Sequence, residues 1–152
     1  QTTESKVMEA KQAIAEGASE IDMVINLGDA KQGDFHSITE EIKALKAVCG
    51  DKILKVIIEA CFLTNEEKIE LCHCVTNGGA DFIKTSTGFG SGGATLEDVQ
   101  LFKKYIGPSV QIKAAGGIRS VEAMKAYIEA GCTRIGASAA VGLLKNRLNE
   151  TL

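Results

Sequence analysis

Residues 81–98, DFIKTSTGFGSGGATLED, place a lysine near the end of an apolar run and a glycine-rich loop directly after it. The loop ends at Thr95, where TLED has a hydroxyl followed three residues later by a carboxylate, a pattern typical of helix starts. The segment therefore predicts a short strand, a loop and a helix in succession. Lys84 lies inside the strand, where a charged side chain needs a physical reason.

The same succession of helix, glycine, strand and loop recurs along the chain. We expect helices over residues 4–16, 36–49, 65–77, 96–106 and 121–130, and a last one from residue 139. We expect strands at Glu20–Asn26, Ile53–Ala60, Asp81–Ser86, Val110–Ala115 and Arg134–Ser138. The first five helices should end in left-handed glycine caps, at Gly17, Gly50, Gly78, Gly107 and Gly131. A helix and a strand in every stretch of roughly 30 residues predict a parallel sheet of βαβ units.

Side chains alternate between the two faces of a strand, and here the two faces differ. One face is aliphatic, whereas the other carries Asp22, Lys55, Glu59, Lys84 and Lys113. In a doubly wound sheet helices would cover that charged face, and each unpaired ion would be costly. A barrel avoids this cost because charges near the carboxyl ends of its strands face a pocket. The predicted fold class is α/β, of the (β/α)8 TIM-barrel type.

The number of expected strands, five, is smaller than the eight that close such a barrel. We expect residues 1–152 to form a single domain, an incomplete barrel of five consecutive parallel βα units that matches the C-terminal five-eighths of a closed one. About 70 further residues at the front would complete it, at roughly 30 per unit. Exposed strand edges bind partners, so we expect either a homo-oligomer, most simply a dimer, or pairing with the missing segment.

Composition excludes several partners. Seventeen basic and twenty acidic residues give a net charge of −3 with no basic block, so neither nucleic acid nor an anionic membrane is an expected partner. No apolar run is long enough to span a bilayer. The five cysteines are an odd number without a disulfide-scaffold spacing, which favours reduced thiols and a cytoplasmic location.

Two motifs resemble cofactor sites but fit them poorly. Gly88, Gly90 and Gly93 form G-x-G-x-x-G, yet the helix begins only after the glycines, and Lys113 stands where a dinucleotide site needs an acid. The run from Cys72 to Cys74 has a histidine between two thiols, but neighbours on a helix point about 100° apart and do not converge on one ion. We expect neither an organic cofactor nor a metal.

Lys84 has two interpretations. It is either a core lysine paired with Asp22 or Glu59, or a nucleophilic amine. Lys113 favours the second, because it lies on the next strand with the same facing, and like charges 4 Å apart repel by about 4 kcal/mol at an effective dielectric of about 20. A lysine deprotonated in this way attacks a carbonyl to form a Schiff base. Asp22, across the pocket, is suited to moving protons.

Glycines after the last two strands predict a phosphate site. AAGGIRS contains Gly116 and Gly117, and RIGAS contains Gly136 and Ser138. The loops after the final two strands of a barrel are where phosphate sites recur, because backbone N–H groups there surround an anion. Two lysines, an acid and a phosphate site together predict carbonyl chemistry on a phosphorylated substrate.

The motifs EIDMVIN, KVIIE, DFIKTSTGF, GGATLEDV, IKAAGGIRS and RIGAS resemble the successive strand motifs of the deoxyribose-phosphate aldolase family, and the resemblance covers essentially the whole chain. It implies a class I aldolase, a lyase without metal or cofactor, that reversibly splits 2-deoxy-D-ribose 5-phosphate into acetaldehyde and D-glyceraldehyde 3-phosphate. It further implies that Lys84 forms the Schiff base, that Lys113 perturbs it and that Asp22 relays protons. Lys55 matches a further pocket lysine, and the implied phosphate-binding residues are Gly88, Gly116, Gly117, Gly136 and Ser138.

Two alternatives stay open. A truncated fragment of such an enzyme would fold, self-associate and at most bind phosphosugars without catalysis. A different barrel enzyme acting on a phosphosugar is the other alternative, although the lysine pair argues against an isomerase.

Overall fold

A single parallel sheet organises the part of the chain that the computed structural model describes, residues 1–150. Its strands lie side by side in chain order, β1-β2-β3-β4-β5, so each connection leads to the adjacent position. Their bounds are β1 Glu20–Val24, β2 Ile53–Ile57, β3 Phe82–Lys84, β4 Gln111–Ala115 and β5 Arg134–Gly136. Parallel strands joined in order through helices are the arrangement of a (β/α) barrel, and the predicted fold class is confirmed for this segment.

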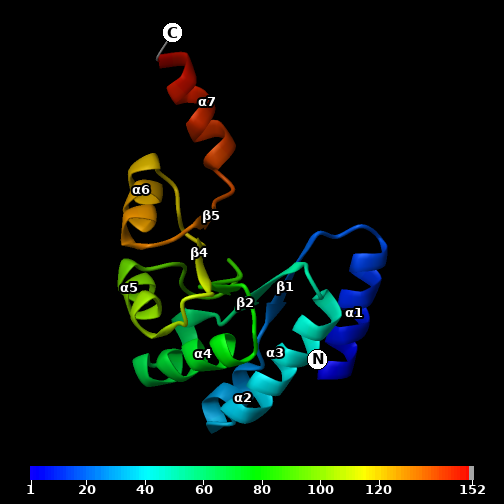
Figure 1. Cartoon of the computed structure of the whole chain (residues 1–152). Coiled ribbons are helices and arrows are strands. Elements are labelled where there is room, and N and C mark those ends of the chain that lie inside the picture. Colours follow the sequence, from blue (N-terminus) through cyan, green and yellow to red (C-terminus); the bar gives the residue numbers. More distant parts are fainter. Residues whose placement is uncertain (151–152) are drawn as a thin grey trace.

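The helices follow one another along the outside of the sheet, as Figure 1 shows. Their bounds are α1 Thr3–Ala15, α2 Leu27–Gln32, α3 Phe35–Cys49, α4 Asn65–Asn77, α5 Leu96–Tyr105, α6 Val121–Ala130 and α7 Ala140–Glu150, with a 3₁₀ helix, η1, at Ala60–Phe62. Helix α1 contacts α3, and α3, α4, α5 and α6 contact one another in chain order. Helix α7, red in Figure 1, extends away from the sheet.

The two faces of the sheet differ as the alternation predicts. The face toward the helices is buried and apolar, and its fully buried members are Leu54, Val56, Ile58, Ile83 and Ala114. On the opposite face the strand register places Asp22 beside Lys55, and Lys84 beside Lys113. The curved sheet therefore gathers charge on its inner face, because the aliphatic residues occupy the face that the helices cover.

Local hydrogen bonds make the strands shorter than the sequence predicts. The side chain of Asn26 accepts a hydrogen bond from the Gly28 amide at 2.9 Å and caps α2, a helix that we did not expect. Thr85 is fully buried, and its hydroxyl oxygen bonds both the amide and the carbonyl of Ala115, at 3.1 and 3.0 Å. The Ala115 amide thus bonds the Thr85 hydroxyl instead of a backbone carbonyl of the neighbouring strand, so β3 ends at Lys84.

Two of the five glycines predicted to be left-handed caps do not have that conformation. Gly78 has φ −74°, and the left-handed residue after α4 is Gly79, with φ 76°. A Cβ at Gly78 would lie 2.4 Å from Cγ2 of Ile42, so this position is glycine because two helices pack closely. Helix α5 likewise ends at an extended Ile106, and Gly107 does not have a positive φ. The helix start predicted at Thr95 is confirmed by a side-chain cap, and Thr64 and Ser120 cap α4 and α6 in the same way.

Candidate active site

Lys84 and Lys113 lie side by side on neighbouring strands. The nitrogen Nζ of Lys84 is 2.7 Å from Oδ2 of Asp22, and Nζ of Lys113 is 3.8 Å from the same oxygen. Only 12 % and 17 % of the two lysine side chains are exposed. Two amines therefore share one small, partly dehydrated space beside a single carboxylate.

A wider network of charges surrounds this pair. Lys55 is almost completely buried, and its Nζ lies 2.7 Å from Asp22 Oδ1 and 2.7 Å from Glu20 Oε2. Arg134 also pairs with Glu20, and its guanidinium lies 4.8 Å from the centre of the Phe82 ring. Because β1 and β5 are the two edges of the sheet, the contact between Glu20 and Arg134 crosses its curved inner face. Among these residues, four cations face two carboxylates.

The excess of cations affects how these groups ionise. Burial lowers the pKa of Lys113, and repulsion by Lys84, Lys55 and Arg134 acts in the same direction, against the attraction of Asp22. Burial acts to raise the pKa of Asp22, but hydrogen bonds from Lys55 and Lys84 outweigh it and hold that pKa below its ordinary value. For Lys55 burial acts downward, and its two carboxylate partners nevertheless raise its pKa. The surroundings of Lys113 thus favour loss of its proton.

A cavity of about 420 Å³ lies at the carboxyl ends of β3, β4 and β5. Lys84 and Lys113 line it together with all five residues predicted to bind phosphate, which are Gly88, Gly116, Gly117, Gly136 and Ser138. Gly88 and Gly117 have φ of 95° and 74°, and a Cβ at either would meet nothing within 4 Å. Their backbone is therefore open to the cavity, as close approach of an anion to N–H groups requires.

The structure adds residues that the sequence reasoning missed. Arg119 and Thr87 line the same cavity, and Arg119 brings a guanidinium, the side chain best suited to phosphate oxygens. Arg119 follows the glycine pair in AAGGIRS, so the motif itself contained that signal. Glu20 and Arg134 share the inner face, and counting in twos from Asp22 would have found Glu20. Asp22 and Lys55 are outside the cavity lining and form the network beside it.

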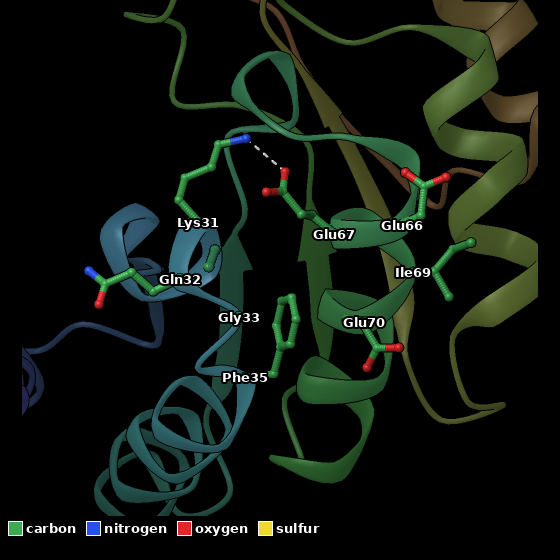
Figure 2. Close-up of a pocket in the computed structure, with 9 residues that line it drawn as sticks. Lys31, Gln32, Gly33, Phe35, Glu66, Glu67, Ile69 and Glu70 are labelled. Atoms are coloured by element: carbon green, nitrogen blue, oxygen red, sulfur yellow. Dashed lines mark hydrogen bonds and ion pairs between the residues drawn. The ribbon is translucent and has the colours of Figure 1, made fainter.

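A second cavity, of about 520 Å³, lies on the helical side of the sheet. Figure 2 shows Lys31 of α2 reaching toward Glu67 of α4, with Nζ and Oε2 2.7 Å apart, and Phe35 between the two helices. This cavity is larger than the first, but it lies between α2 and α4 and contains neither amine of the lysine pair. Size alone therefore does not make it the site.

Other sequence features have structural roles. Cys72 and Cys74 are buried in α4, and burial raises the pKa of Cys72 to about 12. Within residues 1–150, no group of three or more histidine, cysteine, aspartate or glutamate side chains is placed to hold a metal ion. In the same part of the chain, no helix is long and apolar enough to cross a membrane.

A parallel (β/α)-barrel sheet with paired inner-face lysines and a glycine-lined cavity at its carboxyl edge defines a barrel protein with a lysine-centred site. Comparison with known proteins then identifies the family. The sequence model of the DeoC/LacD family of aldolases matches residues 1–147. The chain belongs to that family.

Three relatives show how far the similarity extends. Deoxyribose-phosphate aldolase of Clostridium botulinum is 64 % identical over 144 residues, which are 95 % of this chain and 65 % of that relative. The chain thus spans about two thirds of the length of that relative. Among solved structures, the aldolase QR15 matches with a TM-score of 0.93 and 38 % identity over 99 % of this chain and 68 % of its own. The tetrameric deoxyribose phosphate aldolase from Aeropyrum pernix matches with a TM-score of 0.83 and 29 % identity, over 95 % and 62 %.

Proposed function

We propose that this chain provides the Schiff-base and phosphate-binding part of a lyase that reversibly cleaves 2-deoxy-D-ribose 5-phosphate to acetaldehyde and D-glyceraldehyde 3-phosphate. The observation that carries the proposal is the placement of Lys84 and Lys113 around one oxygen of Asp22, at the mouth of a glycine-lined cavity. A nucleophilic amine, a proton carrier and an anion site are the three parts that such a reaction needs. The names of the relatives support the choice of substrate.

Lys84 is the proposed nucleophile. Its Nζ donates a hydrogen bond to Asp22 Oδ2, 2.7 Å away, and the amine in its neutral form attacks the carbonyl carbon of the sugar. The resulting carbinolamine loses water and becomes an iminium ion. When the bond between the next two carbons of the sugar breaks, its electron pair forms the carbon–carbon double bond of an enamine, and the C=N pair moves to the nitrogen and neutralises its charge.

Lys113 and Asp22 are the proposed proton carriers. When the carbon–carbon bond breaks, a base takes the proton of the sugar hydroxyl and glyceraldehyde 3-phosphate leaves. An acid then protonates the enamine carbon, and water hydrolyses the iminium to release acetaldehyde and free Lys84. Lys113 is suited to both transfers because the lowering of its pKa brings its two protonation states closer in energy at neutral pH.

The phosphate group is proposed to lie at the other end of the same cavity. Gly116 and Gly117 supply backbone N–H groups, Ser138 supplies a hydroxyl and Arg119 supplies a guanidinium. Because the amines and these groups line one cavity of about 420 Å³, a single short sugar phosphate can reach both. Lys55 then acts indirectly, by orienting Asp22 through the contact at 2.7 Å.

The test is to trap the Schiff base with borohydride in the presence of acetaldehyde and to map the modified lysine by mass spectrometry. We expect an adduct of one ethyl group on Lys84, which is lost in Lys84→Arg and kept in Lys125→Arg, an exposed lysine on α6. An adduct on another lysine, or none, would contradict the proposed nucleophile.

A second candidate function is phosphosugar binding without turnover. The observation that favours it is that β1 pairs only with β2 and β5 only with β4 among the described strands, so the inner face is open at both edges. The same trapping experiment separates the two functions. A chain that binds inorganic phosphate but yields no adduct supports the second.

Assembly and location complete the proposal. The open edges, together with the tetrameric relative, support a homo-oligomer, and we propose a dimer in which residues 1–152 form one domain, the C-terminal five-eighths of a barrel. Light scattering after gel filtration tests this, and a clean monomer of 16.1 kDa would contradict it. The five free cysteines support a cytoplasmic location.

A further inference from the structure

Glu59 has a backbone conformation that its side chain does not favour. It follows β2 with φ 53° and ψ 61°, and it is the only residue other than glycine with a positive φ in the described part of the chain. A left-handed conformation is costly for residues of this kind and persists only where the surroundings impose it. The cost points to a role for this side chain.

The carboxylate of Glu59 is buried and binds one residue of the glycine-rich loop. The residue is 5 % exposed. Its Oε1 accepts a hydrogen bond from the Thr87 amide at 3.1 Å, and its Oε2 accepts one from the Thr87 hydroxyl. The hydroxyl oxygen of Thr87 in turn accepts from the Phe89 amide at 3.1 Å. None of the ion pairs found within residues 1–150 includes Glu59, so its partners here are these loop donors.

The loop that Glu59 holds forms one wall of the cavity. Thr87 and Gly88 line the cavity, whereas Phe89 at the middle of the loop is 96 % exposed. The far end of the loop is fixed separately, since Gly93 packs so closely on Gly116 that a Cβ would lie 2.3 Å from the Gly116 oxygen. Glu59 is therefore the anchor of the near end, next to the cavity.

We propose that Glu59 is a positioning residue for phosphate binding, a role that rests on the function proposed above. The carboxylate accepts hydrogen bonds from both the amide and the hydroxyl of Thr87. These two bonds fix the peptide that brings Gly88 into the cavity wall. The carboxylate accepts both as charge-assisted hydrogen bonds, which are roughly twice as strong as the neutral ones that an amide side chain would make. Glu59 is outside the lysine network and acts on the anion end of the cavity alone.

The test compares Glu59→Gln with the wild-type chain in two assays that separate phosphate binding from amine chemistry. In the variant, the Nε2 group donates to the Thr87 hydroxyl oxygen instead of accepting from it, so the contacts become neutral hydrogen bonds and the Thr87 hydroxyl proton loses its acceptor. We expect the dissociation constant for inorganic phosphate, measured by calorimetry, to rise about tenfold, the size of one lost hydrogen bond to a charged group. The yield of borohydride-trapped acetaldehyde on Lys84 should stay within about twofold, because acetaldehyde has no phosphate.

Three further variants complete the design. Glu129→Gln makes the same change at an exposed position of α6 and should leave both assays unchanged. Thr87→Val removes only the hydroxyl and should weaken phosphate binding as well, while Thr87→Ser keeps the hydroxyl and should restore it. If Glu59→Gln folds poorly, these two Thr87 variants still test whether the contact between Glu59 and Thr87 supports phosphate binding.

Each outcome bears on the proposal. Equal losses in both assays would show that Glu59 merely supports the fold, and unchanged phosphate binding would show that the loop does not need it; either result overturns the proposal. A wild-type chain that binds phosphate but forms no adduct defeats the proposed aldolase activity and leaves the comparison of Glu59 variants valid. A wild-type chain that does not bind phosphate overturns the role of Glu59.

Discussion

Asp22→Asn should destabilise the fold, because Asp22 is the carboxylate on which three lysines converge. Its Oδ1 and Oδ2 each lie 2.7 Å from an ammonium, of Lys55 and Lys84, and Lys113 is 3.8 Å away. Breaking a buried ion pair costs about 3–5 kcal/mol. The Asp22 side chain is 31 % exposed and Lys55 keeps Glu20, so solvent screening reduces the expected loss to about 2 kcal/mol.

Urea denaturation of both chains measures this loss as a change in the free energy of unfolding. The matched control is Glu40→Gln, which breaks a pair with Lys43 at 2.8 Å where both side chains are about half exposed. Such surface pairs contribute little, so the control should unfold at the wild-type midpoint. If Asp22→Asn also unfolds there, the inner-face network does not stabilise the fold and the reasoning is refuted.

Three further predictions concern the same groups and the packing of the helices. Hydrogen bonds from lysines lower the pKa of Asp22 below its ordinary value of 3.8. The ionised Asp22 side chain therefore stabilises the fold above pH 3.8, and this stabilisation is lost as the pH falls through the lower pKa of the folded state. An acid titration followed by circular dichroism should show this loss in the wild type and not in Asp22→Asn. Acetylation of Lys113 across a pH series, read by mass spectrometry, should have a midpoint below 10.5, the ordinary pKa of lysine. The midpoint should be lower still in Asp22→Asn, because the attraction of Asp22 raises the pKa of Lys113. A midpoint at 10.5 or above would contradict the proposed charge network. Gly78→Ala should lower the free energy of unfolding, measured by urea denaturation, by about 1–3 kcal/mol, because its Cβ would lie 2.4 Å from Cγ2 of Ile42. Gly142→Ala is the control: its Cβ would meet nothing within 4 Å, so this variant should not be destabilised in the same experiment.

The inner face of the sheet was predictable because strand periodicity is a strong signal. Placing Asp22, Lys84 and Lys113 on one side requires only alternation in twos and consecutive parallel strands, and the register confirms both. The same reasoning extended to Arg134 would have completed the cation set. Alternation does not give the direction of each long side chain. The structure was therefore needed to show that Lys84 lies closer to Asp22 than Lys113 does.

Contacts between distant segments were not predictable from local patterns. Gly78 follows a helix and therefore looks like a cap, but its reason lies in Ile42, a residue of another helix. Glu59 looked like one more inner-face charge, whereas its left-handed backbone turns its carboxylate to the loop at Thr87. The deciding partner is 36 residues away along the chain for Gly78 and 28 for Glu59, separations that propensity and capping rules do not reach.

The most direct measurement of the central claim is a crystal structure of the chain after borohydride reduction in the presence of 2-deoxy-D-ribose 5-phosphate. Our account predicts continuous density from Nζ of Lys84 into the ligand, Nζ of Lys113 beside the new bond, and the phosphate against Gly117 and Arg119. Density joined to a different lysine, or a phosphate bound outside the cavity at the carboxyl ends of β3, β4 and β5, would contradict it.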